Sequence, residues 1–137
     1  MADSVVSLRW DGEGLRFRGG AEGRPEGVVD GDGIIAPSPV QTLLLALAGC
    51  TAADLVDIAG KMRVRLEGLS VVVEGDRRAE PPRRFTRIVM RFRVTGVAAE
   101  DEPKVRRALD LSAEKYCSVL HSLRTEDLEV RAELELV

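Results

Sequence analysis

The feature that most constrains the fold is a long apolar segment, from Val40 to about Met62, that follows two prolines. Ser38 is placed to cap a helix, and Pro39 suits the first helical position, where the N–H that proline lacks would have no partner. At 100° per residue the apolar side chains fall on nearly every side of the helix. A helix that is apolar all round is typically buried. The sequence therefore predicts a helix at the centre of the structure.

The residues before this helix alternate between apolar and polar, as in half-buried strands. Val5–Trp10 and Leu15–Arg18 are separated by a glycine turn, which favours a hairpin, and a second glycine turn at Gly19-Gly20 and Gly23 leads to a third strand at Gly27–Asp30. A sheet this small cannot bury both of its faces alone. We therefore expect it to pack against another surface.

The residues after the helix predict a second sheet and two more helical segments. The class is α+β, with two sheet regions around one buried helix in a single domain, residues 1–137. The expected elements are strands at Leu69–Val73 and Phe85–Val94 joined by a loop with Pro81-Pro82, a helix starting at Asp101 or Glu102, a helical stretch at Tyr116–Leu123, and a closing strand at Leu128–Leu136.

The composition is that of one ordinary globular domain. The chain has 137 residues, 45% of them hydrophobic and 31% charged, and its formal net charge is −3. Binding to a phosphate backbone needs a concentrated positive field, so nucleic acid is not expected as a partner. The short basic runs, Arg77-Arg78 and Arg83-Arg84, lie beside acids and prolines and are typical of solvated loops.

The first ten residues contain Asp3 and Arg9 and no apolar region of a secretory signal. The most apolar stretch, Val40–Ala53, is short for a bilayer. We therefore predict a cytoplasmic protein without a membrane partner. Because the cytoplasm is reducing, a structural disulfide is not expected, and Cys50 and Cys117 are core residues, metal ligands or redox groups.

Polar residues form one stripe on the central helix. Cys50, Asp54, Asp57 and Lys61 are spaced four, three and four apart, so they lie along the same side. One interpretation is that this stripe borders a cavity or an interface. The other, which the spacing alone favours, is that Lys61 pairs with Asp57 near the end of the helix.

Cys117 lies near two groups that favour ionisation of a thiol. Lys115 is two residues away and His121, the one histidine, follows a helical turn later. A helix N-terminus and nearby cations lower the pKa of a thiol, so we expect a reactive thiolate, with His121 accepting its proton or stabilising it. The alternative is that His121 is a surface or packing residue. If Cys50 also lies near, zinc is a further alternative, although no CxxC or HxxxH spacing supports it.

Two segments carry a family resemblance. Ala36–Cys50 (APSPVQTLLLALAGC) resembles the central helix of the osmotically inducible protein C and organic hydroperoxide resistance (OsmC/Ohr) superfamily, and Leu111–Val119 (LSAEKYCSV) is similar to the segment that holds its second cysteine. The order of the elements also fits, so the resemblance covers nearly the whole chain.

The resemblance implies an intertwined homodimer with two active sites at its interface. It implies that Cys50 attacks an organic hydroperoxide and becomes a sulfenic acid, and that Cys117 resolves this acid to a disulfide. The product is reduced by an external dithiol, a lipoyl group in some members, with no bound cofactor and no metal. A sulfenic acid condenses readily with a neighbouring thiol, so the chemistry is consistent. The expected function is a thiol-dependent peroxidase in oxidative-stress defence.

The sequence departs from the hydroperoxide-resistance branch at three positions. Val40 stands where that branch has a glutamate, Ala21 where it has an arginine, and Ser118 where it often has proline. Arg24, three residues after Ala21, is the candidate substitute for that arginine as support for the thiolate. The chain therefore resembles the less characterised OsmC-like branch more closely. The alternative function is small-molecule binding or redox sensing without efficient turnover.

Overall fold

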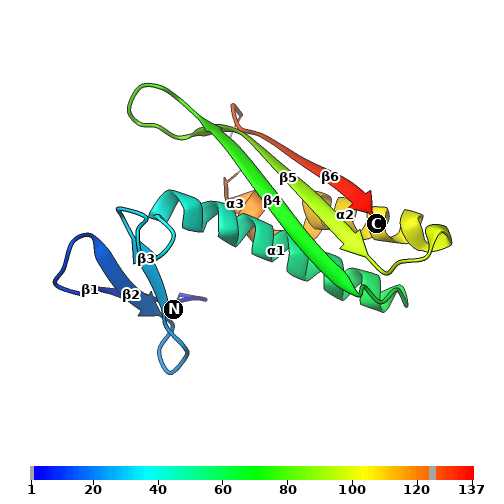
Figure 1. The fold of residues 1–137 in the computed structure, drawn as a ribbon, viewed down its shortest axis with the longest axis horizontal. Helices are drawn as coiled ribbons and strands as arrows, with labels where there is room; N and C mark the ends of the chain where they lie inside the picture. The colour runs from blue at the N-terminus through cyan, green and yellow to red at the C-terminus, as the bar shows by residue number, and fades with distance from the viewer. Residues whose placement is uncertain (1, 124–125) are drawn as a thin grey trace. The chain divides into compact units, whose positions relative to one another are not determined.

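The computed structural model describes residues 2–123 and 126–137. The chain comprises two compact units, Met1–Leu43 and Leu44–Val137, which we call the N-terminal and the C-terminal unit. Each contains its own three-stranded sheet (Figure 1). The α+β class and the two sheet regions that the sequence predicts are confirmed.

The N-terminal unit contains β1 (Ser7–Trp10), β2 (Arg16–Gly20) and β3 (Gly27–Asp30), all antiparallel in that order. The three predicted strands are thus present. The predicted turn at Gly19-Gly20 is wrong, because both glycines belong to β2. A Cβ atom on Gly19 would lie 2.2 Å from the carbonyl oxygen of Ser7, so glycine is needed here for the close approach of two strands rather than for a turn.

A buried carboxylate organises the loop between β3 and the following helix. Asp30 is 1% exposed, and its oxygens accept the N–H groups of Asp32, Ile34 and Ile35 at 2.9, 3.0 and 3.0 Å. These three backbone hydrogen bonds hold the pKa of Asp30 below its ordinary value, because they favour the charged form. The loop is therefore ordered by one ionised side chain.

Helix α1 (Pro39–Lys61) begins where the sequence predicts. Ser38 Oγ accepts the N–H of Gln41 at 3.1 Å, and Gln41 Oε1 accepts the N–H of Ser38 at 3.0 Å, which is a reciprocal capping box. At the other end Arg63 has a φ of 64°, and the N–H groups of Arg63 and Val64 donate to the carbonyl groups of Gly60 and Ala59. This is a Schellman motif with an arginine at the left-handed position.

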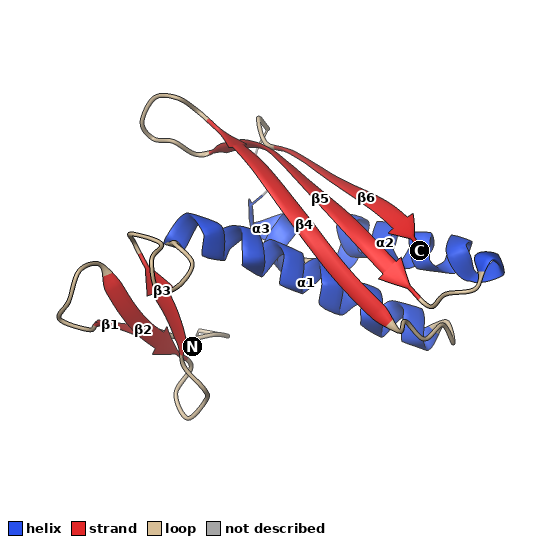
Figure 2. Cartoon of the chain, in the orientation of Figure 1, coloured by secondary structure: helices blue, strands red, loops and turns tan. Residues whose placement is uncertain are grey.

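The C-terminal unit has a sheet of β4 (Gly68–Arg77), β5 (Phe85–Thr95) and β6 (Glu129–Leu136). Strands β4 and β5 form the antiparallel hairpin that the Pro81-Pro82 loop predicts, whereas β6 is parallel to β5. The connection from β5 to β6 contains a 3₁₀ turn (Ala99–Asp101), α2 (Glu102–Leu111), a π-helical turn (Ser112–Tyr116) and α3 (Ser118–Leu123). Figure 2 shows α1 and α2 on the same side of this sheet.

The core of this unit lies between the sheet and the helices. The alternation along Phe85–Val94 in the sequence predicts that Ile88, Met90, Phe92 and Val94 face the core. These residues are almost completely buried, but Val89, which the alternation places on the other face, is only 1% exposed as well. Helix α1 contributes Leu47, Leu55 and Ala59, and α2 contributes Val105, Ala108 and Leu109. The inward residues of β5 are Ile88, Met90, Phe92 and Val94.

Within one chain α1 is buried along one side only, which differs from the all-round burial expected from its sequence. Leu45 and Val56 are 57% and 52% exposed, because the single sheet of the C-terminal unit covers one side of the helix. Among the described helices, α1 is the one long and apolar enough to cross a membrane by length and composition. The core helix of a soluble protein passes the same test, so this is weak evidence.

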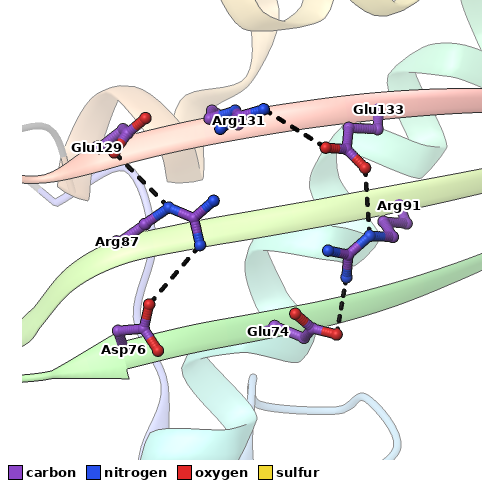
Figure 3. A network of polar contacts seen from close by, with 7 residues as sticks. All are labelled: Glu74, Asp76, Arg87, Arg91, Glu129, Arg131 and Glu133. Atoms are coloured by element: carbon purple, nitrogen blue, oxygen red, sulfur yellow. Dashed lines mark hydrogen bonds and ion pairs between the residues drawn. The ribbon is translucent and has the colours of Figure 1, made fainter.

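The face of the sheet turned away from α1 carries a network of ion pairs (Figure 3). Arg91 on the central strand contacts Glu74 at 2.7 Å and Glu133 at 3.2 Å, and Arg87 contacts Asp76 and Glu129, each at 3.7 Å. Such exposed pairs each contribute about 1 kcal/mol or less. They mark this face of the sheet as solvated.

The left-handed Arg63 generates a prediction about stability. Replacing Arg63 by Gly should raise the free energy of unfolding by about 1 kcal/mol, because the Cβ penalty at a positive φ disappears. Arg63→Ala is the matched control, since it removes the same charged chain but keeps the Cβ atom. Urea denaturation measures both variants, and a gain for Arg63→Ala as large as that for Arg63→Gly would contradict the argument.

Candidate redox site

The structure brings the two cysteines together. Cys50 lies on α1 and Cys117 lies between the π-helical turn and α3. The two Sγ atoms and a carboxylate oxygen of Asp54 all lie within 4.8 Å of one another, and both cysteines are free thiols. Cys50 is partly exposed, whereas Cys117 is completely buried. Two thiols at this separation can form a disulfide after a small movement.

A break in the helical path positions Cys117. The N–H of Cys117 donates to the carbonyl of Ser112 at 2.8 Å, which closes the π-helical turn, and Cys117 itself is extended. Helix α3 then begins at Ser118 with the N–H of Leu120 donating to Cys117 Sγ at 3.4 Å. The helical segment predicted around Tyr116–Leu123 is therefore present, and its α-helical part begins two residues later because Tyr116 ends the π-helical turn.

The prediction of a reactive thiolate at Cys117 is wrong for the reduced protein. Burial raises the pKa of the Cys117 thiol above its ordinary value, because the thiolate would lose its hydration. Hydrogen bonds with Thr51 Oγ1 and the Leu120 N–H, both at 3.4 Å, oppose this shift in part, and Cys50 adds to it. Lys115 instead lies over the ring of Tyr116, 5.3 Å from its centroid.

His121 is a surface residue rather than a partner of the thiol. Its Nε2 lies 3.1 Å from the carbonyl oxygen of Ala113, and the side chain is exposed. Since a carbonyl only accepts, Nε2 carries the proton of this hydrogen bond. The alternative interpretation of His121 from the sequence therefore fits the structure better.

The polar stripe on α1 divides into two parts. Lys61 and Asp57 form an exposed ion pair at 2.9 Å, as the spacing alone favours. Asp54, one turn after Cys50, instead faces the cysteine pair and accepts a hydrogen bond from Ser112 Oγ at 2.8 Å. Ser112, the first residue of the π-helical turn, is a site residue that local sequence patterns do not single out. Its one visible signal was a polar residue in line with the apolar side of α2.

A metal is the alternative use of this cluster. Among the described residues, the one group of candidate metal ligands comprises Cys50, Asp54 and Cys117. His121 is not part of this group, so the three zinc ligands considered from the sequence, Cys50, Cys117 and His121, do not come together. Structural zinc sites have four ligands as a rule. Cys117 Sγ is already hydrogen-bonded by Thr51 and Leu120, so we interpret the group as a redox pair with a neighbouring carboxylate.

Three further sequence-predicted positions lie in the N-terminal unit. Arg24 is an exposed residue of the connection between β2 and β3, where its N–H donates to the carbonyl of Ala21 at 3.1 Å. Val40 lies in the first turn of α1. The role of Arg24 as support for the Cys50 thiolate stays a prediction.

Comparison with known proteins identifies the family. The family model described as OsmC-like protein matches residues 30–133. The chain therefore belongs to this family, on its OsmC-like branch.

One relative supports the same family, and two solved structures share the fold. The chain is 45% identical over 108 residues to the protein YhfA of Escherichia coli strain K12, which covers 78% of this chain and 80% of YhfA. An OsmC-like protein from Mycoplasma pneumoniae has the same fold, with a TM-score of 0.82 at 16% identity over 99% of both chains. An organic hydroperoxide resistance protein from Legionella pneumophila gives a TM-score of 0.64 at 18% identity over 98% of both.

The raised pKa of Cys117 predicts how stability depends on pH. An unfolded chain loses the thiol proton near pH 8.5, whereas the folded protein retains it to higher pH. The stabilisation from Cys117 is thus complete below that value and is lost as the pH rises through the folded pKa. Under reducing conditions, the free energy of unfolding of the wild type relative to Cys117→Ala should fall as the pH rises from neutral to above the unfolded thiol pKa of about 8.5. A constant difference over this range would contradict the raised pKa.

Proposed function

We propose that the protein is a thiol-dependent peroxidase that reduces organic hydroperoxides. The observation that carries this proposal is the pair of free thiols, Cys50 and Cys117, whose Sγ atoms lie within 4.8 Å of each other. The Cys50 thiolate attacks the terminal oxygen of the hydroperoxide, the O–O bond breaks, and the alkoxide leaves as an alcohol after gaining a proton. Cys50 is then a sulfenic acid, which condenses with Cys117 to a disulfide and water.

The unequal burial of the two thiols supports this order of events. A hydroperoxide must reach the sulfur that it oxidises, and Cys50 is partly exposed whereas Cys117 is fully buried. Cys117 does not need to meet the substrate, because it reacts only with the oxidised Cys50. The apolar residues around Cys50 favour an alkyl hydroperoxide over hydrogen peroxide. The structural relative from Legionella is itself named an organic hydroperoxide resistance protein.

An external dithiol would complete the cycle. It attacks the disulfide, releases both cysteines as thiols and becomes a disulfide itself, so no bound cofactor is required. A lipoyl group is one dithiol of the right chemistry. A cytoplasmic location fits this proposal, since a reducing compartment keeps both cysteines free between turnovers.

A second candidate function is redox sensing or ligand binding without efficient turnover. It is favoured by one observation, the carboxylate of Asp54 within 4.8 Å of both sulfur atoms. A negative charge disfavours formation of the Cys50 thiolate and therefore slows its attack on a peroxide.

We propose further that the protein is a homodimer. In one chain, large apolar side chains of α1 and of the first sheet are exposed, among them Leu45, Val56, Leu8 and Trp10. Exposed apolar surface of this kind is typical of protein–protein contacts. Light scattering should therefore give a mass of twice 14.9 kDa. A folded protein with the mass of one chain would contradict the dimer.

The peroxidase proposal predicts different fates for two cysteine variants. One equivalent of cumene hydroperoxide should remove both free thiols of the reduced wild type and lower its intact mass by about two hydrogens. Cys50→Ser should not consume hydroperoxide, whereas Cys117→Ser should complete one turnover and retain Cys50 as a sulfenic or over-oxidised acid. Thiol titration and intact mass measure these outcomes.

Two results would contradict the assignment. Equal residual activity in both variants would overturn the separate roles of Cys50 and Cys117. Two thiols that stay free in the wild type while the hydroperoxide persists would overturn the peroxidase, and ligand binding that survives Cys50→Ser would then favour the second candidate.

A further inference from the structure

One group at the cysteine pair has no part in the chemistry described above. Asp54 follows Cys50 by one helical turn, and a carboxylate oxygen lies within 4.8 Å of both sulfur atoms. Ser112 Oγ donates to Asp54 Oδ2 at 2.8 Å, and the carbonyl of the same serine accepts the N–H of Cys117 at 2.8 Å. Ser112 is completely buried. This one residue therefore fixes the carboxylate and the backbone of Cys117 relative to each other.

The carboxylate does not serve to stabilise a thiolate, because like charges disfavour each other's ionised forms. The Asp54 carboxylate also does not form an ion pair with Lys61, His121 or Lys115, whose side chains have other partners. Lys61 pairs with Asp57, His121 donates to Ala113 and Lys115 lies over Tyr116. Asp54 therefore needs another explanation.

The step in which the Cys50 sulfenic acid condenses with Cys117 offers an explanation for Asp54, because this step requires the transfer of a proton. Cys117 must lose its proton in order to attack the sulfenic sulfur, yet burial raises the pKa of this thiol. The sulfenic oxygen must gain a proton in order to leave as water. Two groups form hydrogen bonds with Cys117 Sγ. The Leu120 N–H cannot accept a proton, and the Thr51 hydroxyl is a very weak base. Among the described groups of the cluster, the Asp54 carboxylate is the one placed to act as a general base.

We propose, on the basis of the peroxidase function above, that Asp54 transfers the proton in the disulfide-forming step. Its carboxylate accepts the proton of Cys117 as the sulfur attacks Cys50, the S–O bond of the sulfenic acid breaks, and the same proton passes to the departing hydroxide. Cys50–SOH and Cys117–SH thereby become the disulfide and one water, and no other oxidant or reductant takes part. The sulfenic oxygen is bonded to Cys50 Sγ, so it lies within reach of the same carboxylate.

Ser112 is then a positioning residue, because it holds the carboxylate but exchanges no proton with the sulfur atoms. Ser112→Ala should slow the disulfide-forming step less than the loss of the carboxylate does. It should leave the rate of sulfenic acid formation unchanged.

The test separates the two steps in single turnovers with cumene hydroperoxide. Intact mass follows the sulfenic acid, which is heavier by one oxygen, and the disulfide, which is lighter by two hydrogens. In Asp54→Asn the sulfenic acid should form at the wild-type rate or faster, while the disulfide should form at least about 100-fold more slowly, the usual range for loss of an acid–base group. Asp54→Glu should restore much of that rate. Asp57→Asn is the matched control on the same helix and should match the wild type in both steps.

A small carboxylate provides a readout that a structural role would not change. Formate added to Asp54→Ala should accelerate disulfide formation in proportion to its concentration, with no effect on Asp57→Ala. Disulfide formation at the wild-type rate in Asp54→Asn would overturn the role of Asp54 and leave the peroxidase intact. Equal slowing of both steps would overturn it as well, in favour of a structural role. A wild type that keeps both thiols and leaves the hydroperoxide unconsumed would overturn both proposals.

Discussion

The C-terminal unit depends on the packing of one side of α1 against the sheet of β4, β5 and β6. The apolar residues Leu47, Leu55 and Ala59 meet the inward side chains of β5, and this contact fixes the rotation of the helix about its axis. Once the rotation is fixed, the i, i+4 geometry of a helix determines where Cys50 and Asp54 point. The position of the first thiol is therefore set by core residues that take no part in any reaction.

The second thiol is placed by a different principle. Cys117 is held by an interruption of regular structure, the π-helical turn between α2 and α3, together with hydrogen bonds between its sulfur and the Thr51 hydroxyl and the Leu120 N–H. The two sulfur atoms thus meet in unequal surroundings, one partly open to solvent and one sealed in the core. This difference allows two residues of the same type to perform different steps, because access selects the first reaction and proximity selects the second.

Much of this fold could be predicted from local patterns. The Ser38 capping signal located the start of α1, and alternation along β5 identified its inward residues, since both depend on neighbours in the sequence. The alternation missed Val89, which is buried on the other face. The parallel pairing of β6 and the hydrogen bond between Ser112 and Asp54 could not be predicted, because each joins segments far apart in the chain. Hydrophobicity alone also does not say which surface covers an apolar helix, and so it overstated the burial of α1 within one chain.

The number of residues in the π-helical turn determines where Cys117 lies relative to Cys50. Its hydrogen bond spans five residues rather than four, so the turn contains one residue more than a continuous α-helix would need. Deleting a single residue between Ser112 and Tyr116 would allow the α-helix to continue and would rotate the position of Cys117 by about 100° about the helix axis. Cys117 would then remain in the sequence but would face away from Cys50. In this protein the number of residues in one turn, as much as their identity, determines whether two thiols can meet.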